Sequence, residues 1–143
     1  MNLVSELTKI KNGTIATVYI VLGTESYLAS VARKTLLDTL LKEEELELNY
    51  GAYDMEEVSI GTALEDAESI PFFGERRVVF VDRPVFLTGE KTKSKIEHDL
   101  KWLENYLTRP SESTTLVLFA PYEKLDERKK ITKLLKKTAT VLE

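Results

Sequence analysis

The sequence predicts an α/β fold of three layers, in which helices cover both faces of a parallel β-sheet. Apolar runs typical of strands alternate about five times with segments whose apolar residues recur at helical spacing. The runs are apolar throughout, which is typical of parallel strands buried on both faces. The connections between them are short, so consecutive elements should pack next to one another.

The first elements of the chain follow this alternation. Residues 2–11 are predicted to form a short helix, because three apolar residues recur there at helical spacing. The run TVYIVLG at 17–23 is continuous and rich in β-branched residues, which favours a buried strand. Residues 26–42 place their leucines on roughly one face and predict a second helix, and 47–54 predicts a weak strand.

The rest of the chain continues the pattern, with Ser59 as the expected N-cap of the next helix. The predicted helices are 59–69, 91–107 and 124–137, and the predicted strands are 77–84, 114–121 and 138–143. The last apolar residues, Val141 and Leu142, lie next to the C-terminus. We therefore expect residues 1–143 to be a single domain taken from a longer protein.

Composition excludes several classes of protein. The net charge is −4, from 20 basic and 24 acidic residues, so any DNA contact would be local, since dedicated nucleic-acid-binding domains are usually basic. The absence of cysteine excludes disulfides, thiolate metal sites and a cysteine nucleophile. No apolar run is long enough to span a membrane and the N-terminus has no signal-peptide core, so a cytoplasmic location is expected.

The segment after the first predicted strand is where a phosphate-binding loop would lie. Counted from Gly23, two of the four defining positions of G-x-x-x-x-G-K-[ST] are present. Leu28 stands in place of the second glycine, Ala29 in place of the lysine, and Ser30 at the hydroxyl position. Leu28 disfavours the positive φ that such a loop needs, and Ala29 supplies no cation for the phosphates. The loop is predicted to be degenerate, and nucleotide hydrolysis is not expected.

Other catalytic chemistry has little support in the sequence. Asp82 stands where a magnesium-binding acid would end the strand, but Arg83 follows, so we expect Asp82 to cap the strand or pair with an arginine. The single histidine, His98, is expected in solvent on the polar side of the 91–107 helix. No catalytic residue, metal site or cofactor is predicted. A small α/β enzyme or phospho-receiver that binds a phosphorylated ligand near Gly23 is the alternative.

Charge is segregated along the chain. From Glu43 to Glu75 there are eleven acidic residues and no lysine or arginine, whereas 124–137 holds seven basic residues against two acidic ones. This basic helix is either a solvated face or a contact surface for a phosphate backbone or an acidic neighbour. Its candidates for contact with DNA or another subunit are Lys129, Lys130, Lys133, Lys136 and Lys137.

Two adjacent phenylalanines, Phe72 and Phe73, lie between a predicted helix and a predicted strand. Fully burying one phenylalanine stabilises a fold by about 1.5–3 kcal/mol, against a typical net stability of about 5–15 kcal/mol. Either both pack into the core or a partner covers them. A turn between Pro71 and Gly74 would allow both rings to project from the surface together.

Four segments of the chain resemble one known family. They are "VYIVLGTESYLASVARKTLL", "NYGAYDMEEVSIGTALEDAESIPFFGERRVVFVDRP", "LENYLTRPSESTTLVLFAPYEKLDERKKITKLLKK" and "TATVLE", and they occur in the family's order. Together they resemble the N-terminal domain of the delta subunit of the bacterial DNA polymerase III clamp loader, most closely the Gram-positive type. The combination of PFFGERRVVFV with L-x-x-Y-L-x-x-P-S-x-S-T-T-L-V-L is the specific part of this resemblance.

The resemblance implies a fold like an AAA+ domain, with a P-loop NTPase-like core that no longer hydrolyses ATP. This agrees with the degenerate phosphate loop, and the family's lid and collar domains are absent from the chain. In the family, a hydrophobic wedge enters a pocket on the sliding clamp and helps open the ring for loading onto primed DNA. By position, the wedge corresponds to Ile70, Pro71, Phe72 and Phe73.

The partners that the resemblance implies are the sliding clamp (beta subunit) and the other clamp-loader subunits (tau/gamma and delta prime). DNA would be contacted indirectly, through the assembled loader, and no membrane contact is expected. The chain would then be a subunit of a DNA-directed DNA polymerase (nucleotidyltransferase) holoenzyme without catalysis of its own.

Overall fold

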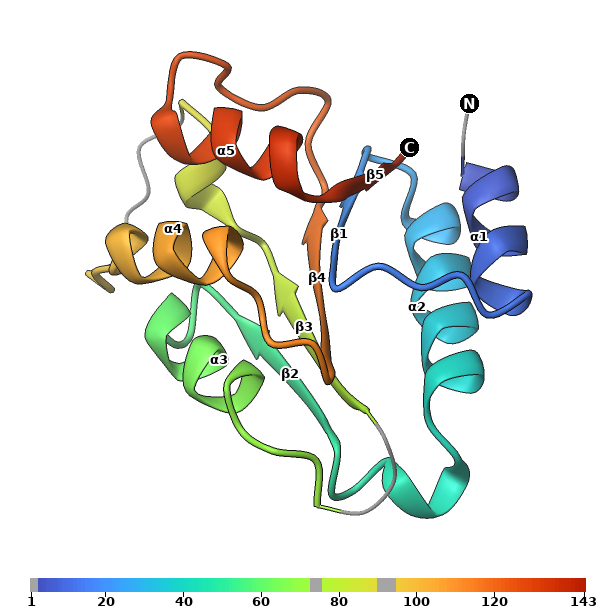
Figure 1. The fold of residues 1–143 in the computed structure, drawn as a ribbon. Helices are drawn as coiled ribbons and strands as arrows, with labels where there is room; N and C mark the ends of the chain where they lie inside the picture. The colour runs from blue at the N-terminus through green and yellow to red at the C-terminus, as the bar shows by residue number, and fades with distance from the viewer. Residues whose placement is uncertain (1–2, 73–75, 90–94) are drawn as a thin grey trace.

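The computed structural model describes residues 3–72, 76–89 and 95–143, so Phe73 lies outside these ranges. Within them, the strands form one sheet in which every neighbouring pair is parallel, in the order β2-β3-β4-β1-β5 (Figure 1). The strands are β1 (Val18–Leu22), β2 (Tyr50–Asp54), β3 (Arg77–Asp82), β4 (Thr114–Ala120) and β5 (Thr140–Leu142). The predicted parallel sheet is confirmed, including the strand that the sequence indicated only weakly.

Helices cover both faces of this sheet (Figure 1). The first two α-helices pack on one face and the last three on the other. The α-helices are α1 (Leu3–Lys11), α2 (Ser26–Leu40), α3 (Ile60–Ala67), α4 (Leu100–Thr108) and α5 (Lys130–Thr138), and the short 3₁₀ helices are η1 (Glu43–Glu45) and η2 (Val85–Leu87). This arrangement gives the three predicted layers. Among the described residues, no helix is both long and apolar enough to cross a membrane.

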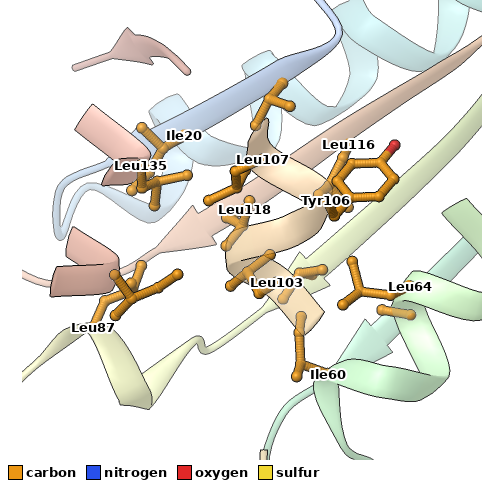
Figure 2. Close-up of a cluster of buried hydrophobic side chains, with 14 of the residues drawn as sticks. Ile20, Ile60, Leu64, Leu87, Leu103, Tyr106, Leu107, Leu116, Leu118 and Leu135 are labelled. Carbon is orange, nitrogen blue, oxygen red and sulfur yellow. The ribbon is translucent and has the colours of Figure 1, made fainter. Parts of the chain in front are cut away.

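The sheet separates two hydrophobic clusters, because successive residues of a strand point to opposite faces. In β3, Val79 and Val81 belong to the cluster under α3, α4 and α5, whereas Val78 and Phe80 belong to the cluster under α1 and α2. All seven residues of the central strand β4 are buried. Figure 2 shows the larger cluster, where side chains of α3, α4 and α5 meet those of β4. Burial on both faces explains why the strands are continuous apolar runs in the sequence.

Helix α4 begins later than the sequence predicted. It starts at Leu100 instead of residue 91, and residues 91–94 lie outside the described ranges. The side chain of Asp99 accepts a hydrogen bond from the Trp102 backbone N–H at 3.0 Å. An aspartate that accepts such a bond is a favourable N-cap, and it sets the start of the helix here.

Helix α5 also begins later than predicted, at Lys130 instead of residue 124. The Asp126 backbone N–H donates to the Leu87 carbonyl at 2.8 Å, and its carboxylate accepts from the Arg128 backbone N–H at 3.0 Å. Local bonds from an aspartate side chain to the following backbone compete with helix formation. The prediction failed because the lysine-rich pattern continues through a segment that these bonds hold as a turn.

The parallel strands give the sheet two different edges. Their carboxyl ends meet at one edge, which we call the carboxyl edge, and it carries Gly23 after β1 and Asp82 at the end of β3. Their amino ends meet at the opposite edge, the amino edge, which carries Asn49 before β2 and Arg77 at the start of β3 (Figure 1). The chain from α3 to β3 returns to the amino edge. The degenerate phosphate loop and the phenylalanine segment therefore lie at opposite ends of the sheet.

Candidate functional site

The segment 70–72 presents large apolar side chains to solvent. The side chain of Ile70 is 86% exposed and that of Phe72 is 67% exposed, while Pro71 is partly buried. The other large apolar residues exposed in the described ranges are Val4, Tyr27 and Leu48. Phe72 is therefore not a core residue in this structure. Phe73, the second predicted ring, lies outside the described residues.

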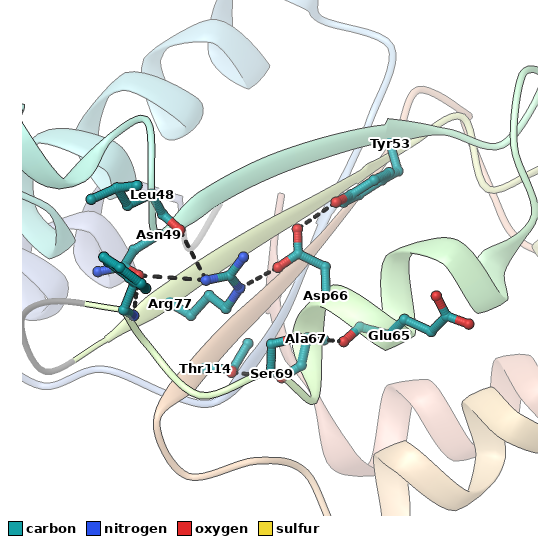
Figure 3. Close-up of polar contacts among 10 residues, drawn as sticks. Leu48, Asn49, Tyr53, Glu65, Asp66, Ala67, Ser69, Arg77 and Thr114 are labelled. Atoms are coloured by element: carbon teal, nitrogen blue, oxygen red, sulfur yellow. Dashed lines mark hydrogen bonds and ion pairs between the residues drawn. The ribbon is translucent and has the colours of Figure 1, made fainter.

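The end of α3 determines where this segment leaves the helix. After Ala67, the Glu68 N–H donates to the Leu64 carbonyl at 2.9 Å and the Ser69 N–H to the Asp66 carbonyl at 3.0 Å. Pro71 has no N–H to continue the helix. The Ala67 carbonyl accepts a hydrogen bond from the Thr114 hydroxyl at 2.7 Å, which fixes the end of α3 to the start of β4 (Figure 3).

A buried asparagine holds the backbone of the segment. Asn49, immediately before β2, is fully buried, and its Oδ1 accepts a hydrogen bond from the Phe72 backbone N–H at 2.7 Å. The same oxygen accepts from the Arg77 guanidinium at 3.4 Å, and that guanidinium also donates to the Leu48 carbonyl at 3.0 Å (Figure 3). The exposed segment is thus attached to the residue before β2 and, through that residue, to the first residue of β3.

The guanidinium of Arg77 is itself fixed by Asp66 of α3, with which it forms an ion pair, and Asp66 also accepts a hydrogen bond from the Tyr53 hydroxyl (Figure 3). Burial, together with the neighbouring Asp66 carboxylate, raises the pKa of Tyr53 to about 12. Gly51 leaves room for this contact, because a Cβ at that position would clash with the Asp66 carboxylate and lie 2.9 Å from the Tyr53 ring. Together these groups form a rigid polar base under the apolar segment.

The amino edge carries charges of both signs, and its basic residues include Lys42 and Arg76. Exposed carboxylates from η1, from the residues that follow it and from the end of α3 lie on this side of the molecule, namely Glu43, Glu44, Glu47 and Glu68.

At the carboxyl edge, the structure shows why the phosphate loop is degenerate. Gly23 has a φ of 139°, a conformation that favours glycine, and its N–H donates to the Ala120 carbonyl at 3.1 Å. Helix α2 starts at Ser26, so Leu28 and Ala29 already lie in its first turns and are partly buried. Only residues 23–25 lie between β1 and α2, so the predicted second glycine and lysine positions of the loop belong to the helix.

The acid at the end of β3 is engaged by an arginine, as predicted for Asp82. Arg33 of α2 forms an ion pair with it, and the Arg33 guanidinium lies 4.3 Å from the centre of the Phe119 ring. A pocket of about 220 Å³ beside Gly23 is lined by both charged groups and by Ser30. Because Arg33 is directed at Asp82, its charge in this pocket is largely neutralised.

A second cluster of charged groups lies at the carboxyl ends of β2 and β3. Arg83, which follows β3, forms ion pairs with Asp54 and Glu56. The hydrogen bond from Arg83 is the main reason that the pKa of Asp54 is lowered from its ordinary value. The position where a second magnesium-binding acid would stand thus holds a paired cation. Among the described residues, no group of three or more potential ligands could hold a metal ion.

The prediction that His98 is a solvated residue of a helix is wrong. His98 is partly buried before α4, and its Nδ1 accepts a hydrogen bond from the Ile60 backbone N–H at 3.0 Å. Ser59 occupies the N-cap position of α3, but the imidazole is the acceptor for this first N–H of the helix. Burial lowers the pKa of His98. The residue therefore has a structural role, which sequence spacing could not reveal because 38 residues separate the two partners.

The basic residues near α5 differ in their surroundings. The Lys129 ammonium donates to the Phe86 carbonyl at 2.9 Å, so this residue has a structural contact. Lys130 lies 3.5 Å from a Glu104 carboxylate, and Lys136 forms an ion pair with Glu127. The remaining two candidates, Lys133 and Lys137, have exposed side chains on α5.

Sequence reasoning missed the residues that support the exposed segment. Asn49, Arg77, Asp66 and Tyr53 come from three different elements and are up to 28 residues apart in the sequence. The one signal in the sequence is Asn49 itself, which the predicted strand 47–54 includes but which lies directly before β2. Their convergence is visible only once the strands are paired.

The fold and these two edges define the class of protein: the chain is an AAA+-like α/β domain with a degenerate phosphate loop. A DNA polymerase III gamma subunit-related protein from Thermotoga maritima has the same fold, with a TM-score of 0.55 at 12% identity, over 97% of this chain and 44% of that one.

Closer relatives identify the family. Residues 19–143 match the family described as DNA polymerase III, delta subunit. The DNA polymerase III subunit delta of Bacillus subtilis (strain 168) is 47% identical over 134 residues, which cover 94% of this chain and 39% of that protein. The solved structure of the Bacillus subtilis DNA clamp loader delta protein matches with a TM-score of 0.93 at 45% identity, over 97% of this chain and 41% of that one. The chain therefore belongs to the DNA polymerase III delta subunit family, and it spans about two-fifths of these relatives' length.

Proposed function

We propose that this chain is the part of a clamp-loader delta subunit that binds the sliding clamp, through Ile70, Pro71, Phe72 and Phe73. The observation that carries the proposal is the exposure of Ile70 and Phe72, at 86% and 67%. Fully burying side chains of this size stabilises a protein by about 1.5–3 kcal/mol each. If a pocket on a partner covers these side chains, their burial contributes to the free energy of binding.

Opening of the clamp then follows from differential binding. A wedge that fits the open ring better than the closed ring shifts the ring toward the open form, without any covalent chemistry in this subunit. To move an equilibrium from about 1:99 to about 99:1, the wedge would have to prefer the open form by roughly 10⁴-fold. Subunits of the tau/gamma and delta prime type would supply the ATP-dependent control of access to this surface.

The chain has no ATPase activity of its own in this proposal. Ala29 stands where the phosphate-binding lysine would be. The two guanidiniums that line the pocket beside Gly23 both have acidic partners: Arg33 is paired with Asp82, and Arg83 with Asp54 and Glu56. The same neutralisation disfavours the alternative of a phosphate-ligand enzyme. Calorimetric titration with Mg–ATP should show no binding, and a micromolar dissociation constant or measurable hydrolysis would contradict this part of the proposal.

The exposed lysines of α5 would contact other loader subunits or the DNA backbone within the assembled loader. Lys133 and Lys137 are the best placed of the five candidates, since their side chains are exposed, whereas Lys129, Lys130 and Lys136 contact Phe86, Glu104 and Glu127. Binding of the chain alone to duplex DNA should be weak, insensitive to sequence and steeply reduced by salt. A salt-resistant, sequence-specific complex would show that the helix is a dedicated DNA-reading element.

The proposed function is tested by titrating the chain with its cognate sliding clamp. Truncation of an aromatic anchor in a pocket typically costs about 2–4 kcal/mol, so Phe73→Ala should weaken binding by roughly 30- to 700-fold. Val4→Ala is the matched control, because Val4 is an apolar residue of α1 that is also exposed, at 74%. Absence of clamp binding by the wild-type chain, or equal affinity of the wild type and Phe73→Ala, would contradict the proposal.

A further inference from the structure

Asn49 is a polar residue buried directly beneath an exposed apolar segment. Its side chain has no exposed surface, yet its Oδ1 accepts the Phe72 backbone N–H at 2.7 Å. Its own carbonyl accepts from the Val78 N–H at 2.8 Å, so the residue is part of the junction between β2 and β3. A buried amide with this geometry is fixed with respect to the sheet and transmits that fixed position to Phe72.

We propose that Asn49 is a positioning residue for clamp binding. It fixes the backbone at Phe72 so that the side chains of residues 70–72 are already directed outward before the clamp arrives. This inference rests on the proposed function, since it concerns the same surface. It adds a residue that would not touch the clamp and acts only through the segment that does.

The side-chain amide of Asn49 is held in place by Arg77. Arg77 donates to Asn49 Oδ1 and to the Leu48 carbonyl, and its guanidinium is paired with Asp66 of α3 (Figure 3). The segment 70–72 is therefore tied to a strand junction and, through the ion pair, to the helix that precedes it. In this arrangement the backbone at Phe72 is already held in place before the clamp binds.

Preorganisation of the segment should have a measurable effect on affinity for the clamp. Each residue whose backbone must be ordered upon binding weakens affinity by a factor of roughly 5 to 30. Removing the Asn49 acceptor frees about one residue of the segment, so Asn49→Leu should weaken clamp binding by a factor within that range. Leucine has a similar volume but offers no oxygen to the Phe72 N–H.

The conservative variant Asn49→Asp separates positioning from packing. Aspartate has the same shape and keeps an oxygen for the Phe72 N–H and for Arg77. Its affinity for the clamp should stay within about threefold of the wild type, since the hydrogen bond to the segment is retained. In amide hydrogen exchange, the Phe72 N–H should exchange faster in Asn49→Leu, and should remain protected in Asn49→Asp.

A double-mutant cycle tests whether Asn49 acts through Phe72. Clamp affinity is measured for the wild type, Asn49→Leu, Phe72→Ala and the double variant. If Asn49 positions the ring, its substitution should have a smaller effect when the ring is absent. A purely structural role would lower the melting temperature equally in both backgrounds and give additive effects on affinity, and additivity would overturn the inference.

The bond can also be removed without changing the Asn49 side chain. Should Asn49→Leu fail to fold, an amide-to-ester substitution at the Phe72 nitrogen removes only the donor, and it should weaken clamp binding to a similar extent. If clamp binding is unchanged by the ester, or by Asn49→Leu, while Phe72→Ala loses affinity, the positioning inference fails and the proposed function stands. If Phe72→Ala itself binds normally, the proposed function fails.

Discussion

Both edges of the sheet contain pairs of arginine and aspartate, but the surroundings of these pairs differ. At the carboxyl edge, Arg33 pairs with Asp82 and Arg83 pairs with Asp54, and these pairs occupy the place where open α/β sheets usually bind ligands. At the amino edge, the pair of Arg77 and Asp66 lies beneath apolar side chains that remain exposed. The usual ligand edge is occupied by ion pairs, while the opposite edge presents the surface that we propose for a partner.

The Arg77–Asp66 pair is more buried than the Arg33–Asp82 pair, and burial determines how much the loss of each pair costs in stability. The side chains of Arg77 and Asp66 are 16% and 9% exposed, whereas those of Arg33 and Asp82 are 33% and 30% exposed. A buried pair is costly to break, because the remaining charge stays desolvated. When a pair near the surface is broken, water hydrates the remaining charge.

The largest effect is expected when the amino-edge pair is broken. Asp66→Ala leaves the Arg77 guanidinium without its carboxylate in a mostly buried site and removes the acceptor of the Tyr53 hydroxyl. The free energy of unfolding should fall by about 3 kcal/mol or more, as measured by urea denaturation. A loss below about 1 kcal/mol would mean that this pair behaves like an exposed one.

A smaller loss is expected from a single added methyl group at the same edge. Gly51→Ala places a Cβ against the Asp66 carboxylate and the Tyr53 ring, so the packing of α3 on β2 must shift. Overpacking of this kind typically costs about 1–3 kcal/mol, and the melting temperature should fall accordingly. Equal stability of Gly51→Ala and the wild type would contradict the close packing described.

At the carboxyl edge the corresponding change should have little effect. Asp82→Ala removes the partner of Arg33, but this guanidinium is partly solvated and keeps its contact with the Phe119 ring. The unfolding free energy should change by about 1 kcal/mol or less, and clamp affinity should stay the same. A large drop in clamp affinity would show that the two edges are coupled.

The smallest expected effect is a dependence of stability on pH at Asp54. Its pKa is lowered in the folded state, chiefly by the hydrogen bond from Arg83, so the stabilising contribution is present above the unfolded pKa of about 4. This contribution is lost as the pH falls through the folded pKa. Since Arg83 is half exposed, Arg83→Ala should remove less than about 1 kcal/mol at neutral pH and flatten the acid limb of the stability profile. If the acid limb is unchanged in Arg83→Ala, the loss of stability at low pH comes from other carboxylates.

Much of the fold could be predicted from the sequence, and the reasons are physical. Burial on both faces makes a strand such as β4 apolar at every position, so continuous runs identified the parallel sheet. The starts of α4 and α5 were misplaced, because they depend on side-chain bonds made by Asp99 and Asp126 instead of on periodicity. Capping and turn bonds of this kind compete with helix patterns that look continuous in the sequence.

The candidate site was predictable in part. Residue type alone left core packing and partner binding both open for Phe72, and only its exposure in the structure favours the second. Asn49 and His98 were missed as supporting residues, since each bonds to a backbone N–H more than 20 residues away. Such contacts exist only after strands and helices have been brought together, so no local pattern encodes them.

The proposed function requires that Phe72 binds a partner and does not stabilise the fold. Phe72→Ala and Tyr27→Ala truncate two exposed aromatic residues, 67% and 74% exposed, at different places on the molecule. Melting temperature and affinity for the cognate clamp are measured for both. We predict nearly unchanged melting in both variants, with affinity reduced by roughly 30- to 700-fold in Phe72→Ala alone. A collapse of melting in Phe72→Ala with normal clamp binding by the folded fraction, or equal affinities of the two variants, would contradict the account.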